Sequence, residues 1–546
     1  MTQRTSRGIG YFKAHVDTAV YDGGFELGKG LGKGLQDSFL GIKPSLYRYC
    51  GEPKIDVEAL SYCLSRLPEG YQNFDRIRIV SGEDDVSGMV LVRSPARRRA
   101  SYVSPNGELV IFPRGGKVDL YDLLSMMITV DAEREKISKM ARRKNTWSRL
   151  KESLDHDPEE QARALADFTD SSYEVVQTAS GNLKGALQER LAEIVYQLGE
   201  KDYSSSRLHV NISQNFREAS TSRIPNKWSS NIKKVVKDKG WYGRPIIVMS
   251  ANMFSPLNVL SPYPRSETDI ELETIRDLGI YPFYSKLKRH LENKSNNEAF
   301  SKANSRIMTK IPDPCNTGVD CQLFDLTEID WDKTDPFVSP DQSFLRSEKP
   351  LLLVMDYPFG SEQSFLLLLY LTLHFEKHYT GFGAIGKAGT FTGEPGCIMI
   401  PNYFMKEGYI AGTCETNNIV DGDDGLLRYL NLRIEKGGSI EDAPIPLITL
   451  DGTFLGNNPL YEYFMDKIKA PGGEMEGHGF AMANQTAILR NRVNPKLPRG
   501  YIYYASDNPL KASEGVSIAQ GSLEEEKGIN ATFGSTIALL NYLLNP

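Results

Sequence analysis

The spacing of hydrophobic positions in the first 200 residues predicts an α+β arrangement. Alternating polar and apolar positions, typical of strands, occur in three segments: 74–82, 89–94 and 100–113. The last of these resembles a hairpin, because Asn106-Gly107 can supply the positive φ of its turn. From Val118 the apolar period becomes 3.6, and helical segments continue to about residue 198. With a short helix at 56–67, these elements form the N-terminal region that we assign to residues 1–204.

Beyond residue 205, short apolar runs alternate with helical patterns. The predicted strands are 208–212, 245–249, 351–355, 380–385, 397–400, 445–450 and 500–504. The predicted helices are 361–375, 459–468, 477–489 and 535–544. This alternation indicates an α/β sheet covered by helices on both faces, with its ligand beyond the carboxyl ends of the strands. Two stretches lack the pattern, and we interpret 311–349 as a long connection and 402–443 as an insertion.

Composition narrows the classes of function. Of the 546 residues, 40% are hydrophobic and 25% are charged, which is ordinary for a globular protein. A net charge of -6 provides no overall positive field to attract nucleic acid. No apolar run approaches the roughly 18 residues of a membrane span. The first residues lack an apolar signal core, and six cysteines are few for this length. We therefore expect a cytoplasmic protein that binds neither membranes nor nucleic acid.

Two acidic motifs suggest chemistry on an N-ribosidic bond. Glu474-Met475-Glu476 precedes the helix predicted at 477–489. The carboxylate of Glu476 can accept hydrogen bonds from both ribose hydroxyls and stabilise positive charge on the sugar. In an extended segment Glu474 would share its face, and Met475 would offer an apolar contact. Acidic residues at a helix N-terminus also complement the helix dipole, and for Glu474 this explanation is equally good.

The second motif, Ser506-Asp507, follows the strand predicted at 500–504. Cleavage passes through an oxocarbenium-like sugar, so the leaving base must be protonated. Asp507 suits this task, because burial raises the pKa of a carboxyl group towards neutrality. A helix or turn cap would explain Ser506-Asp507 alone, but the glutamates upstream favour the catalytic interpretation.

A third segment, Met355 to Gln363, joins a predicted strand to a predicted helix. Its backbone N–H groups and the Ser361 hydroxyl can hold an anion or the attacking water, with Glu362 or Asp356 as base. A strand-to-helix turn capped by Ser361 is an equal alternative.

Two further motifs receive structural interpretations. We interpret the glycine-rich stretch 28–34 as a flexible turn, and 97–99 (Arg-Arg-Arg) as a solvated edge strand or a regulatory anion site.

Four segments, in order, resemble the purine nucleoside phosphorylase superfamily, which includes methylthioadenosine nucleosidase and AMP nucleosidase. They are 384–401, similar to its "GSAGG…GDIVI" segment, 451–454, similar to "SGDxF", the ribose-binding motif at 474–476 and the proton-donor motif at 506–507. The resemblance covers about residues 350–510. It implies a mixed sheet flanked by helices, usually in oligomers. The whole chain also resembles uncharacterised bacterial proteins with this domain at the C-terminal end.

The resemblance also implies substrate contacts. They are expected from Gly386, Lys387, Ala388, Gly389, Thr453 and Ser506, with the Phe454 ring stacked on the base. Lys387 departs from the family pattern, where a small residue is usual, so either a ligand anion lies nearby or the loop is remodelled. The arginines that phosphorylases use for inorganic phosphate have no counterpart that we can place, which favours water as the nucleophile.

We therefore expect a purine nucleosidase similar to AMP nucleosidase, which hydrolyses a nucleoside or nucleotide and releases the free base. Asp507, Glu476 and Glu362 are the expected catalytic residues, and no metal or organic cofactor is required. The alternatives are a phosphorylase that uses inorganic phosphate and a non-catalytic nucleotide-sensing module. By analogy with AMP nucleosidase, residues 1–204 are expected to be regulatory or to mediate homo-oligomerisation.

Overall fold

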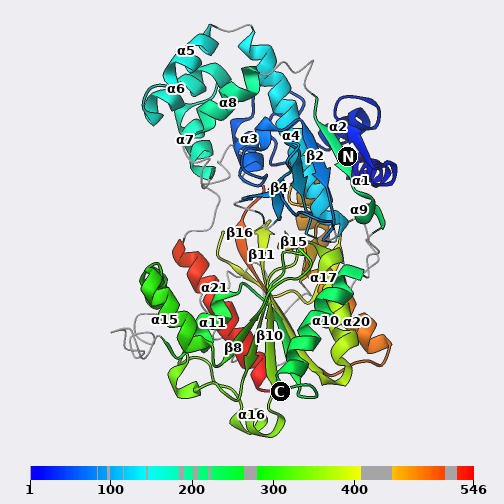
Figure 1. The fold of residues 1–546 in the computed structure, drawn as a ribbon, viewed down its shortest axis with the longest axis vertical. Helices are drawn as coiled ribbons and strands as arrows, with labels where there is room; N and C mark the ends of the chain where they lie inside the picture. Colours follow the sequence, from blue (N-terminus) through cyan, green and yellow to red (C-terminus); the bar gives the residue numbers. More distant parts are fainter. Residues whose placement is uncertain are drawn as a thin grey trace.

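The computed structural model describes most of the chain. The described residues are 2–82, 84–94, 97, 99–114, 116–142, 145–183, 190–200, 207–218, 223–263, 280–407, 445–510 and 525–546. A large mixed sheet with helices on both faces follows an N-terminal α+β region, which confirms the predicted fold class (Figure 1). The predicted insertion at 402–443 lies almost entirely outside the described residues.

A six-stranded sheet with the order β1-β6-β2-β5-β4-β3 forms the centre of the N-terminal region. The strands are β1 (Gly24–Glu26), β2 (Arg76–Ile79), β3 (Val90–Val92), β4 (Ser101–Val103), β5 (Leu109–Ile111) and β6 (His209–Ile212). The predicted hairpin at 100–113 is confirmed: β4 and β5 are antiparallel, and Gly107 has a φ of 75°. Strand β6 pairs with β1 and β2, so this sheet extends past the predicted boundary at residue 204.

Helices pack around this sheet. They are α1 (Thr2–Asp22), α2 (Gly30–Ile42), α3 (Val57–Leu64), α4 (Lys117–Ala141), α5 (Thr146–Ser153), α6 (Pro158–Thr169), α7 (Tyr173–Asn182), α8 (Leu191–Glu200) and α9 (Gln214–Glu218). Helix α2 shows that the flexible turn predicted at 28–34 is wrong. A Cβ atom at Gly32 would lie 2.0 Å from the carbonyl oxygen of Glu26, so this glycine permits close packing of the helix on the chain before it.

The C-terminal sheet has ten strands among the described residues. The order is β13-β14-β15-β11-β7-β10-β9-β8, and β16 pairs with β11 and β12. The strands are β7 (Ile246–Ser250), β8 (Met308–Ile311), β9 (Cys321–Asp325), β10 (Leu351–Met355), β11 (Tyr379–Thr390), β12 (Ile398–Met399), β13 (Tyr403–Lys406), β14 (Pro446–Thr449), β15 (Gly472–Glu474) and β16 (Arg499–Asp507).

Strand β9 corrects the long connection predicted at 311–349. All five of its residues are buried, and it pairs with β10 on one side and β8 on the other. Its polar Gln322 and Asp325 interrupt the apolar pattern, and Asp325 is instead paired with Arg244 at 2.5 Å. The local sequence therefore hides a strand that the neighbouring strands stabilise.

Two layers of helices cover this sheet (Figure 1). One layer holds α10 (Arg223–Asp238), α17 (Ser361–Phe375) and α20 (Gly477–Leu489), and the other holds α11 (Phe254–Leu260), α14 (Ile280–Leu291) and α21 (Glu525–Leu544). The remaining α-helices described here are α15 (Lys294–Asn304), α16 (Gln342–Glu348) and α19 (Asn458–Tyr463). None of the described helices is long and apolar enough to cross a membrane.

The crossing of α17 and α20 is unusually close. A Cβ atom at Gly479 would lie 2.0 Å from the carbonyl oxygen of Ser361, so a larger residue would push the two helices apart. Gly479 and Ser361 lie in the first turns of their helices. Their close approach therefore brings Glu476, before α20, beside Gly360, before α17.

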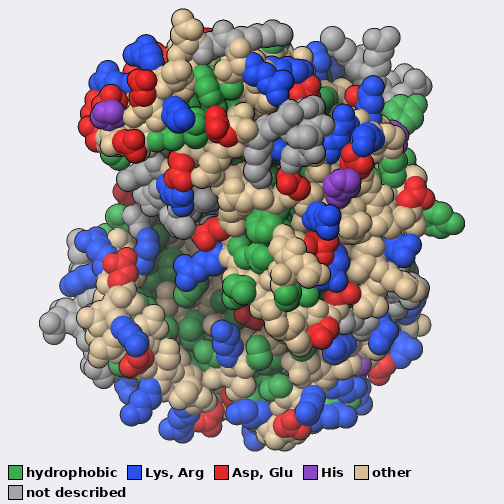
Figure 2. Space-filling model, turned by 45° about the horizontal axis from the view of Figure 1, so that its top comes forward, with side chains coloured by type: hydrophobic (Ala, Val, Ile, Leu, Met, Phe, Trp, Pro, Cys, Tyr) green, Lys and Arg blue, Asp and Glu red, His purple; other side chains and the backbone are tan. Residues whose placement is uncertain are grey.

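The N-terminal region and the C-terminal sheet share a hydrophobic core. Phe454, Leu455 and Phe464 belong to the same buried cluster as Phe12 and Phe39. In Figure 1 the ends of β11 and β16 point towards the N-terminal region. On the outer surface, charged side chains of both signs are interspersed over the face shown in Figure 2.

Candidate active site

The end of β11 brings the two acidic motifs together. Gly389 is paired with Gly473 of β15 on one side and with Asp507 of β16 on the other. Neighbouring strands lie about 4.8 Å apart, so the backbones of the two motifs are roughly 10 Å from each other. The register of β11 and β16 shifts between Ala388 and Gly389, an irregularity typical of strands that shape a site.

Glu474 is almost fully buried and has three donors. Its Oε2 atom accepts hydrogen bonds from the backbone N–H groups of Glu476 and Gly477, both at 2.5 Å, and its Oε1 atom accepts one from the Thr449 hydroxyl. This carboxylate therefore holds the start of α20 against the end of β14. The structure places Glu474 as a residue that builds the site, in agreement with its alternative interpretation at a helix N-terminus.

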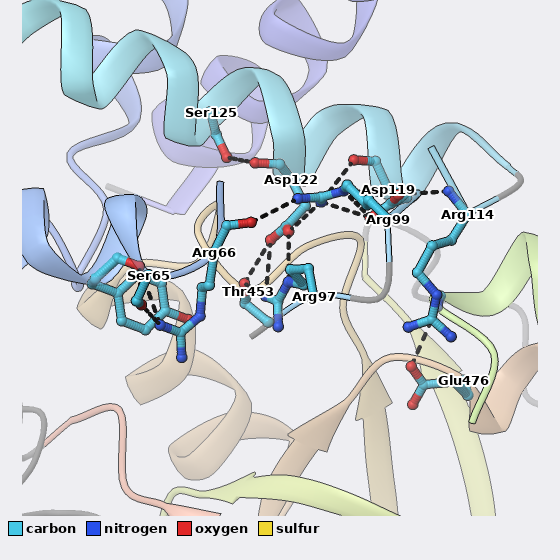
Figure 3. Close-up of polar contacts among 12 residues, drawn as sticks. Ser65, Arg66, Arg97, Arg99, Arg114, Asp119, Asp122, Ser125, Thr453 and Glu476 are labelled. Carbon is cyan, nitrogen blue, oxygen red and sulfur yellow. Dashed lines mark hydrogen bonds and ion pairs between the residues drawn. The ribbon is translucent and has the colours of Figure 1, made fainter. Parts of the chain in front are cut away.

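The Glu476 carboxylate is held by different contacts from those of Glu474. Its Oε1 atom accepts a hydrogen bond from the backbone N–H of Gly360 at 3.3 Å. Figure 3 shows the Arg114 guanidinium beside this carboxylate and joined to it by a dashed line. Burial, followed by the negative charge of Glu474, raises the pKa of Glu476 well above the ordinary range, although Gly360 and Arg114 act in the opposite direction.

Asp507 stands at the last residue of β16. Its Oδ1 atom accepts a hydrogen bond from the Ser506 hydroxyl at 2.5 Å, and Ser506 also approaches the carbonyl oxygen of Ala388 at 3.3 Å. Burial raises the pKa of Asp507, and this effect outweighs the Ser506 hydrogen bond and the positive charges of Arg66 and Lys387. A carboxyl group with a raised pKa is suited to donate a proton.

Tyr503 connects the two motifs and has no counterpart in the sequence-based expectations. Its phenol is 1% exposed, and the nearby charges of Glu474 and Glu476 add to burial in raising its pKa. A Cβ atom at Gly386 would lie 2.3 Å from a Tyr503 ring carbon, so Gly386 is needed for the ring to reach this position. The alternation of Tyr501 and Tyr503 along β16 was the available signal, since both point to one face of the strand.

Thr453 and Phe454 serve the contact with the N-terminal region. The Thr453 hydroxyl donates to Asp122 at 2.7 Å and accepts from Arg97 at 3.2 Å. The Phe454 ring has no exposed surface and is stacked on Phe39, with centroids 6.1 Å apart. The base-stacking role expected for Phe454 is therefore corrected: its ring fills the shared core and leaves no face for a base.

Met475 also lies in a small apolar cluster, with Val118 and Phe359. Its side chain is 9% exposed, so most of it packs between the N-terminal region and the β10–α17 segment.

Lys387 is exposed, and its charge acts on Asp507. The structure thus brings Glu474, Glu476, Asp507 and Lys387 to neighbouring positions at the strand ends.

Ser361 and Glu362 face a different space. Both line a cavity of about 1090 Å³ between α1, α4, α17 and α20, where Asp451 and His478 also lie. The Glu362 carboxylate accepts a hydrogen bond at 2.7 Å from the backbone N–H of Lys117, the first residue of α4. Glu362 therefore caps α4 in this structure. Asp356, the other candidate base, is buried at the end of β10.

The N-terminal region adds four arginines that the motifs did not indicate as site residues. Arg97 and Arg99 form an arginine–aspartate cluster with Asp119 and Asp122 (Figure 3). Arg99 is 3% exposed, which corrects its interpretation as part of a solvated edge strand.

The other two, Arg66 and Arg114, act on the acidic motifs through their charges. Arg114 also donates to the carbonyl oxygens of Gly318 and Tyr357, at 3.1 and 2.5 Å, and so connects the two regions. No local pattern identifies either arginine, because both reach the site only through tertiary packing.

The mixed sheet, its two helical layers and the strand ends that meet at Gly389 define an α/β protein with its candidate site at the strand ends. Residues 33–545 match a family of unknown function, DUF6909, and the chain belongs to this family. No curated protein matches the chain.

Several solved structures are similar to part of the chain. Futalosine hydrolase of Helicobacter pylori matches with 14% identity and a TM-score of 0.30, over 54% of this chain and 97% of its own. The 5′-methylthioadenosine/S-adenosyl homocysteine nucleosidase of the same organism has the same identity and TM-score, over 54% of this chain and 98% of its own. Purine nucleoside phosphorylase of Toxoplasma gondii matches with 13% identity and a TM-score of 0.30, over 55% and 91%. These likenesses concern the fold of about half of the chain.

Proposed function

We propose that the protein hydrolyses the N-ribosidic bond of a purine nucleoside or nucleotide. Glu476 accepts hydrogen bonds from the ribose hydroxyls and stabilises positive charge on the sugar. Asp507 donates its proton to the base as the bond between C1′ and the base nitrogen breaks. Water adds to C1′ and gives up one proton, so the products are the free base and ribose or its phosphate.

The observation that carries this proposal is the position of the two carboxyl groups. Glu476 follows β15 and Asp507 ends β16, and the two strands flank the same residue, Gly389, of β11. Burial raises the pKa of both groups. Gly360 and Arg114 favour the ionised form of Glu476, which can accept hydrogen bonds from the ribose, while Asp507 in its protonated form can donate a proton to the base. The two groups lie on either side of one strand end.

The proton of the attacking water needs an acceptor, which we assign to the β10–α17 segment. Its Gly360 N–H contacts Glu476 directly, so the segment borders the ribose end of the proposed site. Asp356 and Glu362 are its acidic residues. Glu362 could act as the acceptor only by leaving its hydrogen bond with Lys117 and the separate cavity that it lines. We also assign the N-terminal region a regulatory or oligomerisation role in a homo-oligomer.

Chromatography of the products tests the proposal. The protein is incubated with a panel of purine nucleosides and nucleotides, with and without inorganic phosphate. Free base together with free ribose or ribose 5-phosphate is the expected result. Formation of a ribose 1-phosphate would indicate phosphorolysis instead. Binding without any release of base across the panel would contradict the proposal and favour a nucleotide-sensing module.

A further inference from the structure

Arg66 extends from the end of α3 towards the site and is held rigidly. Its guanidinium lies 3.4 Å from the centroid of the Tyr62 ring, and its Nη1 atom donates to the Tyr62 carbonyl oxygen at 3.2 Å and to the Ser65 hydroxyl at 2.9 Å. The buried Nε atom has no hydrogen-bond partner among the described residues. A fixed guanidinium with an unused donor is prepared to bind an acceptor.

No carboxylate of the described residues forms an ion pair with Arg66, whereas Arg97 and Arg99 next to it are both paired with aspartates. A partly buried cation without an anion is costly. Burial lowers the pKa of Arg66, and the positive charge of Arg97 adds to this effect. The folded chain therefore tolerates at Arg66 a charge that it neutralises at the neighbouring arginines.

Cations other than Arg66 also lie near the acidic motifs. The charges of Arg66 and Lys387 act on Asp507, while that of Arg114 acts on Glu476. Three cations thus face three acids, Glu474, Glu476 and Asp507, and burial raises the pKa of each of these acids. An acid that holds its proton does not neutralise a cation, so this arrangement favours an anionic ligand over a neutral one.

We propose that Arg66 binds a phosphate group in the candidate active site. The phosphate belongs either to a nucleoside monophosphate or to inorganic phosphate bound beside a nucleoside. A planar guanidinium can donate two parallel hydrogen bonds to phosphate oxygens, and its delocalised charge suits partial burial. This inference rests on the proposed function for its choice of a purine ligand. It gives the N-terminal region a direct part in substrate recognition.

Calorimetric binding tests this inference without requiring turnover. Affinities for AMP, for adenosine and for adenosine with inorganic phosphate are measured on the full chain and on R66Q. The unchanged protein is expected to prefer AMP, or adenosine with phosphate, to adenosine alone by at least about tenfold. R66Q is expected to reduce that preference to less than about threefold; the preference is the ratio of two affinities measured on the same variant, so an equal change in nucleoside binding cancels. The control R163Q removes an exposed arginine paired with exposed Glu159 and should leave every affinity unchanged.

Two results would overturn the inference. One is a full-length protein that binds AMP no more tightly than adenosine and shows no effect of phosphate. The other is an R66Q variant that melts normally and keeps the whole preference. If R66Q does not fold, R66K replaces it; a preference as large as that of the unchanged protein would then count against bidentate binding by Arg66. A phosphate preference that depends on Arg66, without release of base, would leave the inference standing and the proposed hydrolysis wrong.

Discussion

Two groups of buried charged side chains lie at the contact between the N-terminal region and the C-terminal sheet, and their charges are balanced differently. In the arginine–aspartate cluster, Arg99 donates to both Asp119 and Asp122, at 2.6 and 2.8 Å. Burial acts to raise the pKa of Asp122, but Arg97 and Arg99 outweigh it and hold the pKa at about 2. At the strand ends, burial outweighs the neighbouring donors, and the pKa values of Glu476 and Asp507 are raised.

This difference separates structural charges from reactive ones. Asp122 stays ionised over the whole physiological range of pH, so the cluster can fix α4 through this residue without proton transfer. At the strand ends the pKa values are raised above the ordinary range of carboxyl groups, which is the direction that a general acid needs. Burial does not explain this difference, since Asp122 has no exposed surface and a lowered pKa, whereas the half-buried Glu476 and Asp507 have raised pKa values. What differs between the two groups is the number of counter-charges and hydrogen-bond donors around each acid.

Replacing the proposed acid should give the largest effect on activity. D507N keeps the size of the side chain but cannot donate a proton from a carboxyl group, so cleavage is expected to fall by about 10²–10⁴-fold. Ligand affinity should change little. Product formation by chromatography and binding by calorimetry measure the two effects separately. A variant that cleaves its substrate at the original rate would place the acid elsewhere.

Breaking the arginine–aspartate cluster should give the largest effect on stability. D119N removes a fully buried charge that pairs with Arg99 and accepts the Arg114 backbone N–H at 2.7 Å, so a loss of about 3–5 kcal/mol in the free energy of unfolding is expected. D167N, which disrupts an exposed ion pair with Arg149, should cost at most about 1 kcal/mol. Denaturant titration of both variants measures the difference. Equal losses would show that the cluster is not the stronger structural element.

The fit of Tyr503 against β11 can be tested with one methyl group. G386A places a Cβ atom where the Tyr503 ring now lies, so about 1–3 kcal/mol of stability should be lost. G41A is the control, because a Cβ atom there meets nothing within 4 Å. Thermal unfolding compares the two. If G386A melts like G41A, Tyr503 does not hold the strand-end acids in place.

The smallest expected effect is a dependence on pH. The folded-state pKa of Glu476 is raised above its ordinary value of about 4.3, so the folded protein binds more protons and loses stability as pH rises through that window. The amide that replaces this carboxyl group in E476Q cannot ionise. The melting temperature of E476Q relative to the unchanged protein should therefore rise from about pH 5 to about pH 8.5. A difference that stays constant or declines with pH would contradict the raised pKa.

The elements that the sequence predicts well are those with strong local patterns. Helices α17 and α20 begin and end at the predicted residues, because both are apolar runs that begin at a serine or a glycine and end just before a charged residue. Strand β9 was missed, since its polar residues are satisfied by partners distant in the chain. Gly32 of α2 was misinterpreted for a related reason: it permits close packing of the helix on Glu26, which local propensity does not reveal.

In the candidate site, too, the sequence located some residues but could not show the contacts that they make. The motifs at 474–476 and 506–507 locate acids that the structure brings to neighbouring strands. The sequence could not show that Thr449 and two backbone N–H groups occupy Glu474 but leave Glu476 freer. Nor could it show that Phe454 would be enclosed by the N-terminal region. Arg66 stands at the end of a short helix, where a solvated side chain is the ordinary expectation.

A crystal structure of D507N with bound AMP tests the central claim most directly. The account predicts one AMP molecule with its ribose hydroxyls within hydrogen-bond distance of Glu476 and its purine ring against residue 507. AMP bound only in the cavity between α1 and α17, or a ribose that does not contact Glu476, would contradict it.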